Sequence, residues 1–375
     1  MPGGSHRGCE SGPMARIVTV YNSWRQEFRP VDMSSIRWLK ISESLSRLGH
    51  KVDIATNEKF MWWKLRRFPV QMGDNLRRVP LREVRWADYD VIKTLFHSGF
   101  NTLEAFGGTG HPFIISKLGS VVGPEDMKGI YFYGRKREFL YATQRKIDQT
   151  STYVTVLSEP ARELWEACFG PRTNILLVPG AADRDVPAPT ADPFPKTDWM
   201  RCIFVGNVYG KESQPEANSV LVDKLNRLGR LLSSSDIRLY MLGPGQVGML
   251  DRRYVTYLGV VGYEQSWNYL HFAHVGIVIA PGSYVHNNES TKIYHYLRVG
   301  LPVVSEAGFP NDHVVRESQL GFVVENGNLD LMAEKIQEAA RKDWNRDFAV
   351  QYILANHTWD KRVEVYDAII RRHCE

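Results

Sequence analysis

The first hundred residues alternate short apolar runs with an amphipathic stretch. Residues 15–21 (ARIVTVY) form a β-branched apolar run that predicts a buried strand. After a polar loop, apolar residues recur at helical spacing over 36–48 and stop at Gly49, which predicts a helix with a glycine at its end. Residues 52–55 (VDIA) predict the next strand. Strand, helix and strand in this order indicate a parallel sheet covered by helices.

The same alternation continues along the chain. In the first half we expect strands at 90–96, 112–116, 153–157 and 175–178, with helices at 131–149 and 159–168. In the second half we expect strands at 202–205, 237–242, 255–258, 275–280, 302–305 and 322–324. The helices expected there are 217–232, 263–272, 289–299, 331–341 and 359–371. The predicted fold class is α/β, with two doubly wound Rossmann-like domains facing a cleft.

Composition changes between the two halves. Residues 179–195 are rich in Pro, Ala and Asp, as is typical of a linker. We therefore expect domains at 14–185 and 199–358, a linker at 186–198 and a final helix at 359–375. Residues 1–13 lack the apolar segment of a signal peptide, and we expect a disordered lead or tag there.

Overall composition excludes several classes of protein. Of the 375 residues, 43% are hydrophobic and 24% charged, which excludes disordered and low-complexity chains. No apolar run is long enough for a transmembrane helix. A net charge of +5 is too dilute to indicate nucleic-acid binding. The four cysteines are far apart and lack metal-site spacing, so we expect free thiols in a reducing, cytoplasmic compartment.

The most informative segment is 287–304, NNESTKIYHYLRVGLPVV. Ser290 and Thr291 suit the start of a helix, where hydroxyl and backbone N–H groups bind anions. Lys292 falls in the first turn, where a cation opposes the helix dipole unless an anion is bound. The alternative is an ordinary capped helix with a surface lysine.

This segment resembles the donor-binding signature of GT-B glycosyltransferases, especially family 4. Residues 204–211 (FVGNVYGK) resemble the glycine-rich turn of that family, and 240–246 (YMLGPGQ) its Gly-x-Gly turn. Residues 257–281 resemble the segment that cradles the base, and 357–366 resemble the closing helix that crosses back to the N-terminal domain.

The resemblance implies a nucleoside-diphosphate sugar, with UDP or GDP, as co-substrate, and neither a cofactor nor a metal ion. Lys292 would neutralise the leaving diphosphate as the catalytic cation. The donor-binding residues implied are Gly206, Asn207, Lys211, Gly243, Gly245, Tyr263, Asn287, Asn288, Glu289, Ser290, Thr291, Lys292 and His295.

One departure from the family concerns its two glutamates, which lie eight positions apart and contact the sugar and the ribose. Asn287 and His295 occupy these positions, and Glu289 substitutes only if the loop shifts. The xanthan-type glucuronosyltransferases share a Ser-x-Lys pattern without the acidic pair, and they invert configuration. Retention and inversion therefore both stay open.

The N-terminal domain is expected to bind the acceptor, which is a glycan, a lipid-linked sugar or a small molecule. If the enzyme inverts, a base must take the acceptor proton. Residues in loops after predicted strands are ranked Asp126, then Glu27, then His97. For each of them the alternative is an ordinary solvated loop residue.

Residues 61–68 (MWWKLRRF) mix aromatic and basic side chains, and Arg77, Arg78, Arg82 and Arg85 follow. Such a surface suits anionic lipid, which implies peripheral attachment to the inner face of the membrane. The alternative is a helix that packs its apolar side inward. Asp183-Arg184-Asp185 matches an Asp-x-Asp metal motif, but we expect it to be a solvated linker loop.

These patterns together predict a metal-independent glycosyltransferase. A nucleotide-sugar epimerase on the same fold and a non-catalytic two-lobed sugar-binding protein are the alternatives. An epimerase would need no acceptor, whereas a binding protein would turn over nothing.

Overall fold

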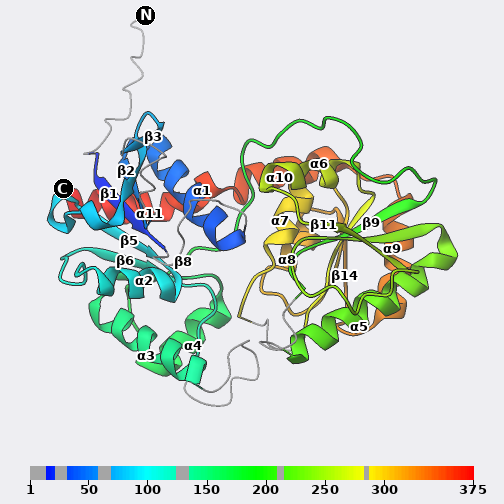
Figure 1. The fold of residues 1–375 in the computed structure, drawn as a ribbon, viewed down its shortest axis with the longest axis horizontal. Helices are drawn as coiled ribbons and strands as arrows, with labels where there is room; N and C mark the ends of the chain where they lie inside the picture. The colour runs from blue at the N-terminus through cyan, green and yellow to red at the C-terminus, as the bar shows by residue number, and fades with distance from the viewer. Residues whose placement is uncertain (1–13, 22–31, 58–68, 124–134, 209–214, 283–286) are drawn as a thin grey trace, which may run out of the picture.

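The computed structural model describes residues 14–21, 32–57, 69–123, 135–208, 215–282 and 287–375. These residues form two α/β domains that lie side by side in Figure 1. Each domain is built on its own sheet. The expectation of two parallel-sheet domains is therefore confirmed.

The N-terminal sheet is parallel except at one edge, where the hairpin strand β3 runs antiparallel to β4. Its strands, in spatial order, are β3 (Val70–Gly73), β4 (Leu76–Pro80), β2 (Lys51–Thr56), β1 (Arg16–Val20), β5 (Val91–Leu95), β6 (Ile114–Lys117), β7 (Tyr153–Val156) and β8 (Ile175–Leu177). Its helices are α1 (Met33–Arg47), α2 (Phe96–Ala105), α3 (Arg135–Thr150) and α4 (Glu159–Phe169), with short 3₁₀ turns at Leu81–Glu83 and Trp86–Asp88.

The C-terminal sheet is parallel throughout. Its strands, in spatial order, are β11 (Val255–Gly259), β10 (Ile237–Leu242), β9 (Met200–Val205), β12 (Val275–Val278), β13 (Val303–Glu306) and β14 (Gly321–Val324). Its helices are α5 (Pro215–Leu232), α6 (Tyr263–Phe272), α7 (Thr291–Arg298), α8 (His313–Glu317), α9 (Leu329–Arg341) and α10 (Arg346–Asn356), with a 3₁₀ turn at Ser233–Ser235.

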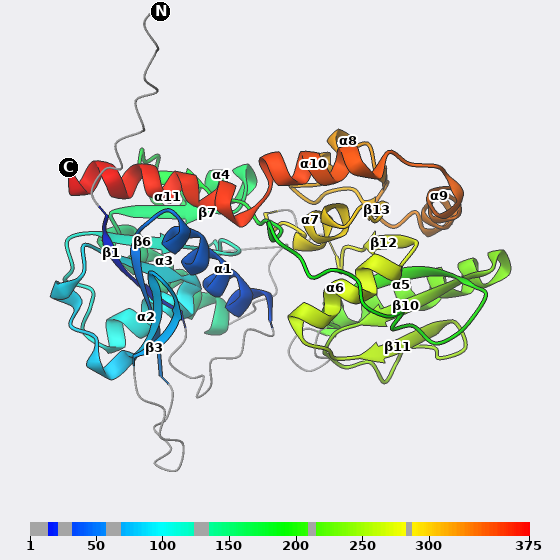
Figure 2. The same ribbon diagram turned by 90° about the horizontal axis from the view of Figure 1, so that it is seen from above.

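The last helix, α11 (Trp359–Cys374), belongs to the N-terminal core although it follows the C-terminal domain in sequence. Trp359, Val363 and Tyr366 are buried in the same cluster as Ile17 and Ile41. Figure 2 shows α10 along the C-terminal domain and α11 continuing along the N-terminal one. The chain therefore passes between the domains twice, once near Gly180 and once before α11.

Several features escaped the sequence pattern, including the five-residue helix α8. The β3–β4 hairpin is short and its outer strand is largely exposed, so it lacks an apolar run. Helix α2 starts directly at the end of β5, at Phe96, whose φ of +59° is unusual for a non-glycine residue. Helix α10 has a weakly amphipathic sequence. No helix among the described residues is long and apolar enough to cross a membrane.

Candidate active site

A small pocket lies at the carboxyl ends of β9 and β12, against the N-terminus of α7. It has a volume of about 90 Å³. Five predicted donor-site residues line it together, namely Asn207, Asn288, Glu289, Ser290 and Lys292. Ligands of open α/β sheets bind at this edge of the sheet, so the pocket lies where the motif predicted a site.

Among the described residues that line this pocket, Lys292 is the only cationic one. Its stem crosses the turn after β9: a Cβ placed on Gly206 would lie 2.8 Å from Lys292 Cε. Its Nζ lies 5.2 Å from the centre of the Phe204 ring, and no described residue accepts a hydrogen bond from it. Burial lowers the pKa of Lys292 to about 8. Within the described ranges, this ammonium therefore lies beside a helix N-terminus without an anionic partner.

Ser290 immediately precedes α7 and is held by its backbone. Its N–H donates to Asn311 Oδ1 and its carbonyl accepts from Asn311 Nδ2, each at 3.0 Å. Ser290 is 5% exposed, and its Oγ has no hydrogen-bond partner among the described residues and does not cap the helix. A buried hydroxyl without a partner costs free energy, which a ligand oxygen in the pocket would recover.

The two glycine-rich turns pack backbone against backbone. Gly243 has a φ of +133°, and a Cβ there would lie 2.2 Å from the Gly206 carbonyl oxygen. Gly245 has a φ of +131°, and its Cβ would lie 2.0 Å from the carbonyl oxygen of Val208. These glycines therefore shape the turn beneath Lys292, and the structure gives them a packing role whether or not they touch a donor.

Glu289 uses its carboxylate to hold the connection between the domains. Its Oε2 accepts from the Gly180 N–H at 2.5 Å and its Oε1 from the Tyr294 hydroxyl at 2.8 Å. Burial raises the pKa of this carboxyl. Although Glu289 also borders the pocket, both its oxygens are engaged at the linker.

Asn287 and Thr291 face the N-terminal domain. Asn287 is fully buried. Its side-chain Nδ2 donates to the Val121 carbonyl at 3.2 Å, and its backbone carbonyl accepts from Ser158 Oγ at 3.0 Å. Arg37 of α1 donates from Nη2 to Thr291 Oγ1 at 2.6 Å. The loop before α7 and the first turn of α7 are thus fastened to three separate parts of the N-terminal domain.

His295 lies one helical turn after Lys292 on α7 and packs against aromatic residues of the C-terminal domain. Its ring packs 4.9 Å from Trp267 and 5.9 Å from Tyr263, centre to centre. Burial lowers the pKa of His295 to about 3, and its Nε2 has no hydrogen-bond partner. His295 and Tyr263, both predicted to bind the donor, are therefore in contact with each other. Neither lines the pocket that contains Lys292.

His97 is buried on α2, at the carboxyl end of β5. Its Nε2 lies 3.0 Å from Gln144 Oε1, and Gln144 also binds both backbone groups of Val122. Burial lowers the pKa of His97 to about 4. A neutral histidine with such a low pKa is a weak proton acceptor near neutral pH.

Three predicted site residues, Glu27, Asp126 and Lys211, lie outside the described residues, as does the basic aromatic segment 61–68. Two expectations are wrong. Asp183 is buried rather than solvated, because its Oδ2 pairs with Lys40 Nζ at 3.2 Å. Arg78 is 6% exposed within β4 and so cannot belong to a lipid-facing surface.

Buried cations gather where the domains meet. Lys117, at the end of β6, donates from Nζ to the Val178 carbonyl at 2.5 Å. Burial lowers the pKa of Lys117 well below the usual lysine range, and the charges of Arg37 and Lys93 lower it further. Lys93 is also fully buried, and its Nζ lies 3.7 Å from the centre of the Tyr366 ring. Sequence patterns gave no signal for Lys93, because it lies inside a largely apolar strand.

Within the described part of the chain, no group of three or more His, Cys, Asp or Glu side chains is arranged to hold a metal ion. Of the residues that the structure describes at the pocket, Lys292 and the N-terminus of α7 supply the positive charge available to an anion.

Comparison with known proteins places this geometry in context. Residues 231–349 match the family described as "Glucosyltransferase 3-like, C-terminal domain". This match includes α7 and the glycine turn after β10 but not the N-terminal domain. A search of curated protein sequences finds no significant match.

Solved structures resemble the whole chain. Sucrose-phosphate synthase from Thermosynechococcus elongatus superposes with a TM-score of 0.65 at 14% identity, over 95% of this chain and 98% of that one. WaaG, a glycosyltransferase involved in lipopolysaccharide biosynthesis, gives 0.64 at 14% identity, over 94% and 99%. HepE of Anabaena, solved with UDP and glucose, gives 0.62 at 11% identity, over 95% and 99%. The shared architecture is the GT-B fold.

Proposed function

We propose that this chain, which has the GT-B fold, is a glycosyltransferase that takes its sugar from a nucleoside diphosphate bound at the N-terminus of α7. The observation that carries this proposal is the Lys292 ammonium, which lines a pocket and has no anionic partner among the described residues. The neighbouring Ser290 hydroxyl also lacks a partner in the described part of the chain. A diphosphate oxygen would satisfy both groups and the free N–H groups of the helix.

In the proposed reaction, charge builds up on the diphosphate as the bond to the sugar breaks. Lys292 and the first turn of α7 are already in position, so no reorganisation is needed to stabilise that charge. Asn311 holds Ser290 in place through two backbone hydrogen bonds. The contact between Arg37 and Thr291 keeps the acceptor domain close to the same helix turn. Donor binding and the position of the two domains are therefore linked.

We place the acceptor in the N-terminal domain. If the reaction inverts configuration, a base on that side must take the acceptor proton. His97 is poorly suited to this role, because its Nε2 is bound to Gln144 and its pKa is lowered to about 4. Asp126 remains our first candidate for the base that takes the acceptor proton, and Glu27 the second.

The test is a thermal-shift panel of UDP, GDP and ADP in the presence of EDTA. A ligand at ~100 times its Kd stabilises the folded protein by about 2.7 kcal/mol, a readily measured shift. We expect UDP or GDP to raise the midpoint in wild type and not in Lys292→Met. Equal shifts in both proteins, or none with any nucleotide, would show that the diphosphate does not bind at α7.

A finer proposal concerns the acceptor. We propose that it is lipid-linked, and that the basic and aromatic residues of 61–68 bring the enzyme to anionic membranes. Reversing the charges of Arg66 and Arg67 should weaken sedimentation with phosphatidylglycerol vesicles, whereas reversing the exposed Arg227 should not. Equal sedimentation of all three proteins would exclude this role for the segment.

The comparisons do not favour the epimerase or the binding protein. The family description names a glucosyltransferase, and the similar structures named above include a synthase and a glycosyltransferase. Incubation with a nucleotide sugar, with and without acceptors, separates the three activities directly. A transferase releases nucleoside diphosphate in an acceptor-dependent way, whereas an epimerase changes the sugar nucleotide without an acceptor.

A further inference from the structure

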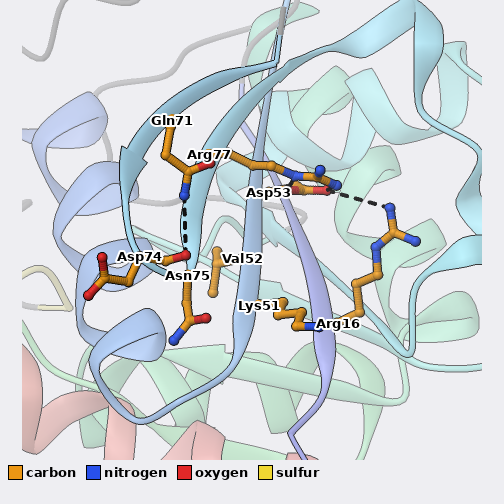
Figure 3. Close-up of a pocket in the computed structure, with 8 residues that line it drawn as sticks. All are labelled: Arg16, Lys51, Val52, Asp53, Gln71, Asp74, Asn75 and Arg77. Carbon is orange, nitrogen blue, oxygen red and sulfur yellow. Dashed lines mark hydrogen bonds and ion pairs between the residues drawn. The ribbon is translucent and has the colours of Figure 1, made fainter.

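A second and larger pocket lies on the N-terminal domain, at the amino ends of β1, β2 and β4 (Figure 3). Its volume is about 450 Å³, within the range of small-molecule sites. Arg16 and Lys51 are the first residues of their strands, and Arg77 is the second residue of β4. The contacts with the donor domain come from the carboxyl side of the sheet, through Val121 and Ser158. This pocket is therefore separate from the cleft.

The chemistry of the pocket is organised around Asp53, which is 3% exposed. Arg77 donates to it from Nε at 2.5 Å and from Nη2 at 2.8 Å. The Tyr89 hydroxyl donates to Oδ2 at 2.7 Å. These three hydrogen bonds occupy the carboxylate, and its charge is compensated mainly by Arg77.

Arg16 is left without such a partner. Its Nη2 lies 3.9 Å from Asp53 Oδ2, beyond hydrogen-bond distance, and no other described residue accepts from its guanidinium. The guanidinium instead lies over the Tyr89 ring, 4.6 Å from its centre. Tyr89 therefore orients Arg16 with its ring and Asp53 with its hydroxyl. In Figure 3, Arg16 and Arg77 both reach towards Asp53.

The described residues that line the pocket carry one more positive than negative charge. Arg16, Arg77 and Lys51 line it against Asp53 and the more distant Asp74. Like charges held close together repel each other, and the side chains of Arg16 and Arg77 are 39% and 37% exposed, so an incoming anion can reach both. Two planar guanidinium groups suit the oxygens of a phosphate.

The opposite wall carries amide groups. The side chain of Gln71 bends back onto the hairpin, where its Nε2 donates to the Asp74 carbonyl oxygen at 3.2 Å. Asn75 follows Asp74 and also lines the pocket. Amides and carboxylates of this kind bind hydroxyl groups. We propose that this pocket binds a phosphate ester of a hydroxylated small molecule, with the phosphate on Arg16 and Arg77, outside the catalytic cleft.

Isothermal titration with glucose 6-phosphate and with inorganic phosphate tests the proposal. Arg16→Gln removes a guanidinium that makes only a 3.9 Å ion pair with Asp53, and it leaves Asp53 with all three of its hydrogen bonds, so its unfolding midpoint should stay near that of wild type. The affinity of Arg16→Gln for glucose 6-phosphate should fall about 10- to 100-fold, the usual loss for a charge-assisted hydrogen bond. Arg172→Gln is the matched control, because Arg172 has similar exposure and lies at the far edge of the same sheet.

Lys292→Met distinguishes this pocket from the one at α7. We expect it to bind glucose 6-phosphate as wild type does, whatever happens to its nucleotide binding. Phosphatidylglycerol vesicles separate a lipid headgroup from a soluble ester: binding to vesicles alone, lost in Arg16→Gln, would assign the phosphate to lipid. Three results would overturn the proposal. Wild type and Arg16→Gln could bind the probes equally well, or binding could be lost only in Lys292→Met. The third such result is that no probe binds at millimolar concentration.

Discussion

Replacing Lys292 by methionine should make the protein more stable and less active. Methionine keeps the length and the apolar stem of lysine but removes the charge. The pKa of Lys292 is lowered from 10.5 to about 8, and each pKa unit corresponds to about 1.4 kcal/mol. Carrying the charge therefore costs the folded state up to about 3 kcal/mol at neutral pH. Because the side chain is only half-buried, solvent screens part of this cost, and we expect a gain of about 1–3 kcal/mol.

The stability that Lys292→Met gains over wild type should depend on pH. The pKa is lower in the folded than in the unfolded state, so the unfolded state binds more protons between about pH 8 and 10.5. Wild-type stability therefore rises with pH across this window as Lys292 loses its proton. The advantage of Lys292→Met is full below pH 8 and disappears above 10.5. In the free enzyme, nucleotide affinity should fall over the same window as the ammonium is lost.

The activity should change in the opposite direction. Removal of one pre-positioned charge from a leaving-group site typically lowers kcat/KM by about 10²- to 10³-fold. Urea unfolding followed by tryptophan fluorescence measures stability, and release of nucleoside diphosphate measures turnover. Lys335→Met is the control for a lysine that is already paired, with Glu338, and we expect no gain in stability from it. A Lys292→Met protein that is destabilised and still binds UDP would refute the reasoning, because Lys292 would then be a structural residue.

Three further predictions follow from the same contacts. Gly243→Ala should cost about 2 kcal/mol or more in unfolding free energy, because its Cβ would meet the Gly206 carbonyl at a φ of +133°. Gly248→Ala, with no atom within 4 Å of its Cβ, should stay within about 0.5 kcal/mol of wild type in the same urea titration. His295→Ala should raise KM for the donor with little change in kcat if His295 only helps to bind the ribose, and a collapse of kcat would give it a catalytic role. Lys93→Met should raise the unfolding free energy, since burial lowers the pKa of Lys93 well below its usual value; a lower urea midpoint would contradict this.

Local pattern was enough to predict most of the fold. Strand and helix periods depend on nearest neighbours, so β10 and α6 begin and end where their apolar spacing indicated. The segment 287–304 also led to the pocket, because an N-cap, a first-turn lysine and a terminating glycine are all local signals. The donor roles of individual residues stay predictions.

The tertiary structure alone decided how these residues are used. Glu289 looks in the sequence like a replacement for a sugar-binding glutamate, yet its carboxylate binds Gly180 and Tyr294. Asp183 looks like a solvated linker residue, yet it is buried against Lys40. In most of these pairs the partners lie more than a hundred residues apart, and no periodicity along a chain records which distant groups a fold brings together. The phosphate pocket around Arg16 depends on the same physics, because it exists only where three parallel strands begin side by side.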